Sequence, residues 1–142
     1  MTIELVPLCT VRAQAKPPIE VGAGPAGTRF VFEIAQSKLE GDRLTGELLG
    51  SASADWLLVG PEGTASLDVR MTYRTGDGAV VLVHYTGRAD LSRGMRFPAT
   101  SALSVLFETG DERYAWLNRV QAVGKGTVYE DLSMDLEWYE VR

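Results

Sequence analysis

The sequence predicts an all-β fold, a single antiparallel β-barrel of about 8–10 strands with one short helical turn. Three observations predict it. Apolar and polar residues alternate with a period of two in several segments, turn-forming residues separate those segments at short intervals, and no segment carries a 3.6-residue apolar stripe of helix length. A chain of 142 residues has room for one hydrophobic core, so residues 1–142 are expected to form one domain.

The predicted strands are defined by their alternation. Residues 67–73 place Leu, Val, Met and Tyr on one face and Asp, Arg and Thr on the other. The segment 79–85 is dense in β-branched residues, and 101–107 and 132–139 alternate again. These segments are typical of half-buried strands.

Turn signals lie between the predicted strands, at 40–42, 60–63 and 75–78. The last contains Asp77-Gly78 between two apolar runs, which is a strong hairpin signal. One helical turn is expected at 112–117. A barrel is favoured over the alternative, a β-sandwich, because closure removes the exposed edges of a sheet.

A glycine-rich segment at 22–27, Gly-Ala-Gly-Pro-Ala-Gly, matches the dinucleotide-binding fingerprint. That motif requires a helix after it, whose N-terminus binds the pyrophosphate. Residues 28–35 alternate as a strand instead, and Pro17-Pro18 weaken a strand before it. The sequence therefore predicts a glycine-rich loop without a nucleotide.

Composition excludes several function classes. The net charge of -5 and the absence of a basic stripe argue against nucleic acid and anionic membranes as partners. Cys9 and His84 are the only residues of their kinds, so no disulfide and no multi-histidine metal site is expected. No cofactor or metal is predicted. Without an 18-residue apolar run or a basic N-terminal region, the protein is expected to be cytoplasmic.

The segment 107–118, Phe-Glu-Thr-Gly-Asp-Glu-Arg-Tyr-Ala-Trp-Leu-Asn, resembles the signature of the family called domain of unknown function 3237. Shorter matches at 24–29, 44–48, 54–56 and 139–141 extend the resemblance over nearly the whole chain. The resemblance implies a small β-barrel similar to cofactor-free cyclases and isomerases. The segment before Phe97-Pro98 is shorter than is usual in that family, and if it covers the barrel mouth the substrate differs in size or entry route.

Asp55 and Trp56 are the first candidate site residues. Asp55 is predicted to act as a general base beside an aromatic wall at Trp56, because burial raises the pKa of a carboxyl group toward neutrality. The alternative is that Asp55 caps the preceding turn through backbone hydrogen bonds.

Asp68 and Arg70 share one face of the predicted strand at 67–73. If that face points into the barrel, Arg70 stabilises an oxyanion and Asp68 contacts the substrate. If it points outward, the two form an exposed pair of little energetic consequence. Alternation alone leaves both possibilities open.

Glu108 follows an apolar strand, and Tyr114, Trp116 and Asn118 are spaced by two after it. In the functional interpretation Glu108 is an acid or base, Tyr114 stabilises an oxyanion, and Trp116 and Asn118 bind substrate. A plug that closes one barrel end explains the same residues equally well.

His84 is a minor substrate-binding candidate, since histidine titrates near neutral pH, and Tyr85 is expected to be a packing residue. The leading hypothesis is a cofactor-independent isomerase, cyclase or lyase that acts on a small organic molecule in the barrel cavity by acid/base chemistry. The alternatives are a lipocalin-like carrier of a small ligand and a structural protein with a filled barrel. A homodimer is possible in each case.

Overall fold

The computed structural model describes all residues from Met1 to Arg142. It contains ten strands and one 3₁₀ helix, η1. Their bounds are β1 Leu5–Ala15, β2 Ile19–Gly24, β3 Gly27–Glu40, β4 Gly46–Leu48, β5 Ala54–Val59, β6 Thr64–Thr75, β7 Val80–Asp90, β8 Ala99–Glu108, η1 Glu112–Arg119, β9 Ala122–Val128 and β10 Ser133–Val141.

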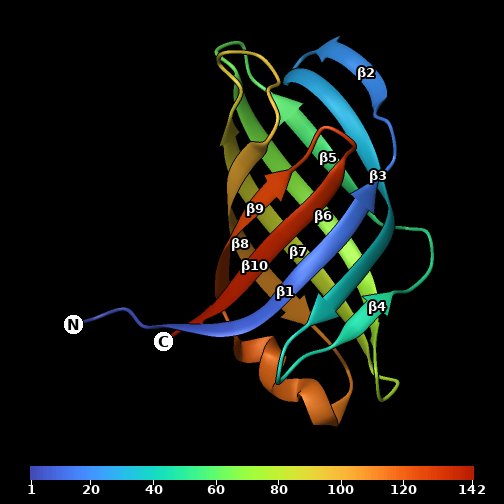
Figure 1. Cartoon of the computed structure of the whole chain (residues 1–142), viewed down its shortest axis with the longest axis vertical. Coiled ribbons are helices and arrows are strands. Elements are labelled where there is room, and N and C mark those ends of the chain that lie inside the picture. Colours follow the sequence, from blue (N-terminus) through green and yellow to red (C-terminus); the bar gives the residue numbers. More distant parts are fainter.

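The strands form a closed antiparallel barrel (Figure 1), as predicted. From β1 the order runs through β10, β9, β8, β7 and β6, and then through β4 and β5 to β3. The long strand β3 closes the barrel because its second half pairs with β1, from Thr10↔Glu40 to Ala15↔Ile34. Its first half pairs with β5 and with β2, which extends beyond the barrel wall as a hairpin.

The two ends of the barrel differ. The helix η1 lies across the lower end in Figure 1, and the β2–β3 hairpin and the β7–β8 loop stand at the upper end. At the start of η1 the Asp111 carboxylate accepts a hydrogen bond from the backbone N–H of Arg113, which satisfies a helix N-terminal donor. The single helical turn predicted at 112–117 is therefore an eight-residue 3₁₀ helix.

Alternation sorts the side chains into an inner and an outer set. On β6 the residues Val69, Met71 and Tyr73 are buried, whereas Arg70 and Arg74 are exposed. Trp138 of β10 is 1% exposed, and its indole meets the rings of Tyr85 and Phe107 edge-on at 6.1 and 5.9 Å between centroids. The polar–apolar alternation read from the sequence thus defines the barrel interior.

The glycine-rich segment 22–27 differs from its expected structure. Gly22 and Gly24 lie in β2, a turn follows, and Gly27 begins β3, so a hairpin replaces the predicted loop. Gly22 and Gly27 have φ of 90° and 137°, values at which a Cβ is strained, and a Cβ on Gly27 would meet the Val59 carbonyl oxygen at 2.8 Å. The glycines therefore allow the backbone to form this hairpin.

The structure has no helix with the length and apolar character needed to span a membrane.

Two tryptophans test the assignment of inner and outer faces. We expect Trp138→Ala to lower the free energy of unfolding by about 3–5 kcal/mol, because it removes a fully buried aromatic side chain. Trp56→Ala is the matched control: Trp56 is 38% exposed on the outer face, and its loss should cost less than about 1 kcal/mol. Urea unfolding followed by far-UV circular dichroism measures both, and equal losses would contradict the assignment.

Candidate functional site

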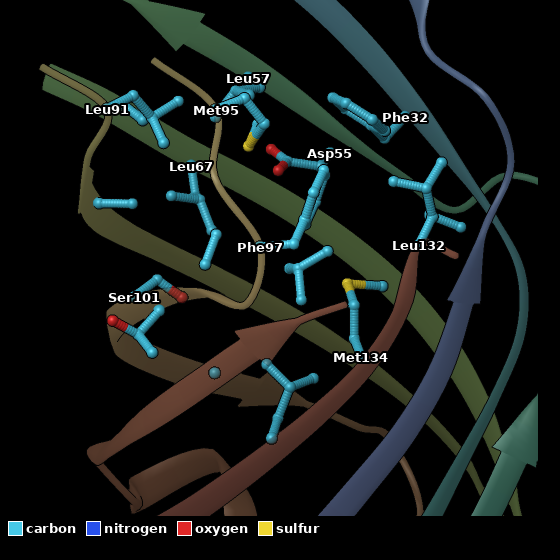
Figure 2. Close-up of a pocket in the computed structure, with 18 of the residues that line it drawn as sticks. Phe32, Asp55, Leu57, Leu67, Leu91, Met95, Phe97, Ser101, Leu132 and Met134 are labelled. Carbon is cyan, nitrogen blue, oxygen red and sulfur yellow. The ribbon is translucent and has the colours of Figure 1, made fainter. Parts of the chain in front are cut away.

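A cavity lies inside the upper end of the barrel, opposite η1. Its volume is about 90 Å³, and sixteen of its twenty lining residues are hydrophobic. The larger apolar side chains of the lining include those of Phe32, Leu57, Leu67, Met95, Phe97 and Met134 (Figure 2). An engineered apolar cavity of about 150 Å³ holds benzene, so a molecule of that size can bind here only if the lining side chains move apart.

Asp55 contributes the only carboxylate to the cavity lining. It lies on β5 opposite Phe32 of β3 and Val69 of β6, and the pleat turns all three side chains to the inner face. Its Oδ1 accepts a hydrogen bond of 3.1 Å from the backbone N–H of Asp68. Figure 2 shows the carboxylate among apolar side chains, with Met95 and Leu57 nearby.

Burial raises the pKa of Asp55 from its ordinary value of 3.8 to about 7. The hydrogen bond from the Asp68 backbone acts in the opposite direction, the Asp68 carboxylate adds a smaller increase, and Arg29 adds a decrease. The carboxyl group is therefore divided between its protonated and ionised forms near neutral pH. Such a group can both take up and release a proton.

The β7–β8 loop covers the mouth of the cavity with Leu91, Met95 and Phe97. Met95 and Phe97 are 49% and 38% exposed although they line the cavity, so their side chains separate its interior from solvent. This is the segment that is shorter than expected from the family resemblance. A ligand larger than the cavity has to displace these side chains.

Arg70 and Asp68 do not line the cavity. Arg70 is exposed, and Asp68 lies half-exposed on the same outer face of β6. The Asp68 carboxylate pairs with His84 of β7, with 2.8 Å between Oδ1 and Nε2. The expectation that Arg70 stabilises an oxyanion inside the barrel is therefore corrected, because the inner positions of β6 belong to its apolar residues.

Glu108 and Trp56 also face outward. Glu108 is exposed at the end of β8, where its neighbour Phe107 takes the inner position. Trp56 follows Asp55 on β5, and consecutive strand residues point to opposite faces. Trp56 therefore lies on the outer face of the sheet and does not form the aromatic wall expected beside Asp55. The apolar side chains of the barrel interior shield Asp55 from water instead.

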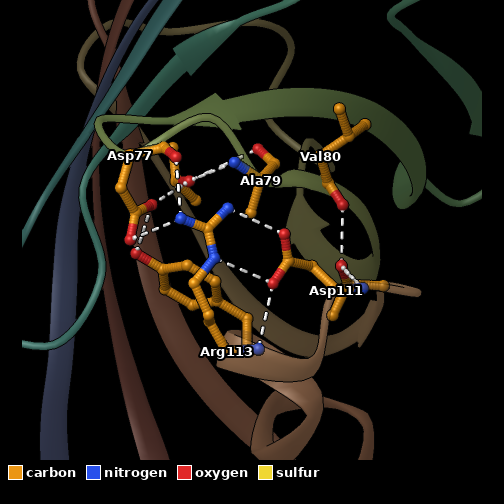
Figure 3. Close-up of polar contacts among 8 residues, drawn as sticks. Asp77, Ala79, Val80, Asp111 and Arg113 are labelled. Atoms are coloured by element: carbon orange, nitrogen blue, oxygen red, sulfur yellow. Dashed lines mark hydrogen bonds and ion pairs between the residues drawn. The ribbon is translucent and has the colours of Figure 1, made fainter.

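Tyr114 joins a network of polar contacts at the opposite end of the barrel, in which Figure 3 labels Asp77, Asp111 and Arg113. Its hydroxyl donates a hydrogen bond of 2.9 Å to Asp77 Oδ1. The Arg113 guanidinium lies between Asp77 and Asp111, at 3.4 and 2.8 Å from their carboxylates. These contacts tie η1 to the β6–β7 turn, and they fit the plug interpretation of this segment.

Asn118 and Trp116 complete that plug. Asn118 exchanges two hydrogen bonds with the Thr109 backbone, each 2.9 Å long, and so fastens the end of η1 to the residue after β8. Trp116 packs beneath the Arg43 guanidinium at 5.1 Å from the ring centroid. Of the nine site residues predicted from the sequence, the structure places only Asp55 at the cavity.

Sequence reasoning treated Tyr85 as a packing residue and passed over Ser101, yet both line the cavity. Period-two alternation with His84 places Tyr85 on the inner face of β7. The signal was present in the strand pattern, but it could not show that the barrel is left unfilled at this level. No group of three or more His, Cys, Asp or Glu side chains is arranged to hold a metal ion.

The fold and the cavity define a class of protein, a closed antiparallel β-barrel whose upper end encloses a small, mostly apolar cavity. Residues 3–141 match the model of the family described as protein of unknown function (DUF3237), and the chain belongs to that family. This confirms the resemblance noted at 107–118.

Three known proteins are similar to this chain. The chain is 26% identical over 141 residues to a UPF0311 protein of Rhodopseudomonas palustris, with 92% of each chain covered. It is 24% identical over 124 residues to the hydroalkoxylation enzyme phnH of Penicillium herquei, covering 81% of this chain and 75% of that protein. A β-barrel-like protein from Acinetobacter baumannii superposes with a TM-score of 0.88 at 26% identity, covering 100% of this chain and 98% of the other.

Asp55→Asn tests the electrostatics of the cavity. Because the folded protein holds the Asp55 proton more tightly than the unfolded chain does, the parent loses stability as the pH rises from about 4 to 7. The amide of the variant does not ionise, so the variant keeps its stability over this range. Relative to the parent, its free energy of unfolding should rise by on the order of 2–4 kcal/mol, and this gain should be complete above pH 7.

Urea unfolding of both proteins at pH 4, 5.5, 7 and 8 measures the gain. Comparing the two proteins at each pH removes the effects of carboxylates common to both, such as Asp77 and Glu140. A stability difference that stays constant with pH would show that the cavity does not perturb Asp55.

Proposed function

We propose that this protein is a cofactor-independent enzyme that transfers protons within a compact, mostly apolar organic molecule bound in the upper cavity. The observation that carries the proposal is a single carboxylate, Asp55, in a cavity whose lining is mostly apolar. An apolar lining binds the ligand by excluding water, and the carboxylate supplies the one group that can exchange a proton with it.

Asp55 acts as the base and the acid in this proposal. Its carboxylate takes a proton from one position of the ligand and returns a proton to another, which amounts to isomerisation, cyclisation or elimination without net oxidation. A pKa of about 7 suits both directions at neutral pH, since neither protonation state is rare. The hydrogen bond from the Asp68 backbone holds the carboxylate in place on the cavity wall.

The hydroalkoxylation enzyme among the relatives supports small-molecule chemistry in this family. Hydroalkoxylation adds an O–H bond across a carbon–carbon double bond, and it is a proton-transfer reaction without redox change. At 24% identity the relative does not fix the substrate of this chain. It does favour the same general class of reaction.

A carrier function is the second candidate, and the apolar lining is the observation that favours it. A carrier binds its ligand saturably and releases it unchanged. The two functions differ in the fate of ligand protons.

Hydrogen exchange distinguishes the two functions. We expect the protein to accelerate deuterium uptake at the carbon next to the carbonyl group of a small cyclic ketone, cyclopentanone, in D₂O. Asp55→Asn should reduce the protein-dependent rate by about 10²-fold or more, because it removes the proton acceptor. Proton NMR of the ketone gives the rate directly, and the rate should rise as the pH passes 7 and Asp55 ionises.

Glu108→Gln is the matched control. It removes a carboxylate that is exposed on the outer face at the end of β8, and it should leave the exchange rate unchanged. Equal rates for the parent and Asp55→Asn would rule out the enzymatic role of Asp55. Binding of the ketone without any protein-dependent exchange would favour the carrier.

A further inference from the structure

The cavity contains a second polar group that the proposed function does not use, the hydroxyl of Tyr85. This residue is 3% exposed and lines the same space as Asp55. The other fully buried tyrosine of the barrel, Tyr73, shares its hydroxyl with Ser37 at 2.8 Å and with Met71 Sδ at 3.2 Å. The Tyr85 hydroxyl makes no hydrogen bond to a protein group, although such buried groups are nearly always paired.

The strand register places Tyr85 and Asp55 in one row. Asp55 is opposite Val69, and Val69 is opposite Tyr85, so all three side chains share the inner face. Two strand spacings separate the backbones of Asp55 and Tyr85 by about 10 Å. Both residues line the cavity, whereas the smaller Val69 between them does not. A ligand in this space can therefore contact both polar groups.

The chemistry of the two groups is complementary. Burial and the nearby charge of Asp55 both raise the pKa of Tyr85 well above its ordinary value, so the phenol keeps its proton at any physiological pH. It can therefore donate a hydrogen bond where Asp55 in its ionised form can only accept one. An apolar molecule that binds between them gains most by presenting an acceptor oxygen to Tyr85 and an acidic C–H to Asp55.

We infer that Tyr85 donates a hydrogen bond to the ligand, and that the cavity selects compact apolar molecules carrying a carbonyl oxygen beside the carbon that faces Asp55. This inference rests on the proposed function and names its substrate class. The Asp55 carboxylate takes the proton from the carbon, the C–H electron pair forms a carbon–carbon double bond, and the carbonyl π pair moves onto oxygen. Tyr85 stabilises the resulting enolate oxygen, and Asp55 returns a proton to complete the step.

A pair of isosteric probes tests the selectivity. Cyclopentanone presents a carbonyl oxygen, whereas methylenecyclopentane replaces that oxygen by a CH₂ group of similar shape. NMR titration gives the two dissociation constants. Tyr85→Phe should weaken binding of the ketone about 5- to 10-fold relative to the hydrocarbon, the change expected when one buried hydrogen bond is lost.

Tyr73→Phe is the matched control, since that hydroxyl is bonded within the barrel and does not line the cavity. It should leave the ratio of the two dissociation constants unchanged while lowering the urea midpoint. Tyr85→Phe should leave the midpoint unchanged or raise it, because no protein partner is lost. Infrared difference spectra should show the carbonyl stretch of bound ketone at a lower wavenumber in the parent than in Tyr85→Phe.

The outcomes separate this inference from the proposed function. The inference is overturned if Tyr85→Phe leaves the ratio of the two dissociation constants unchanged, or if the parent does not bind the ketone saturably. Selective, Tyr85-dependent binding without Asp55-dependent deuterium exchange supports the inference and overturns the proposed function. If deuterium exchange depends on Asp55 but Tyr85→Phe leaves the ratio of the dissociation constants unchanged, the proposed function is supported and the role of Tyr85 is overturned.

Discussion

The antiparallel pairing of β1 with β3 is the constraint on which the rest of the structure depends. Without it the sheet would end at two exposed edges, and neither face of the strands would be enclosed. Once the pairing forms, every strand has an inner face that is shielded from water and an outer face that is exposed to it. The burial of the core, the desolvation of Asp55 and the exposure of Arg70 all follow from that closure.

The two ends of the closed barrel are covered in different ways. At the lower end η1 is bound by an ionic network around Arg113 and by the two hydrogen bonds between Asn118 and Thr109. At the upper end the β7–β8 loop covers the cavity, and its Met95 remains half exposed. In the proposed function a ligand enters at this end and displaces the exposed side chains of Met95 and Phe97.

A buried carboxylate in an apolar cavity costs stability at neutral pH, because its ionised form is poorly solvated there. In this barrel the one hydrogen bond that the Asp55 carboxylate accepts comes from the backbone N–H of Asp68. A neutral residue at the same position would make a more stable barrel. Groups held at such a cost are concentrated at functional sites, and this is why the cavity rather than the charged outer face is the place to look for chemistry.

The sequence by itself determined the fold class, the strands with the clearest alternation, the position of the short helix and the family, because period-two alternation and turn chemistry are local properties. It also put Asp55 among the candidates. Only the tertiary structure decided which candidates meet. Asp55 and Trp56 are adjacent in the chain but lie on opposite sides of the sheet, whereas Asp55 and Tyr85 are thirty positions apart and share one row. Alternation separates two faces, but strand register and closure decide which side chains share a cavity.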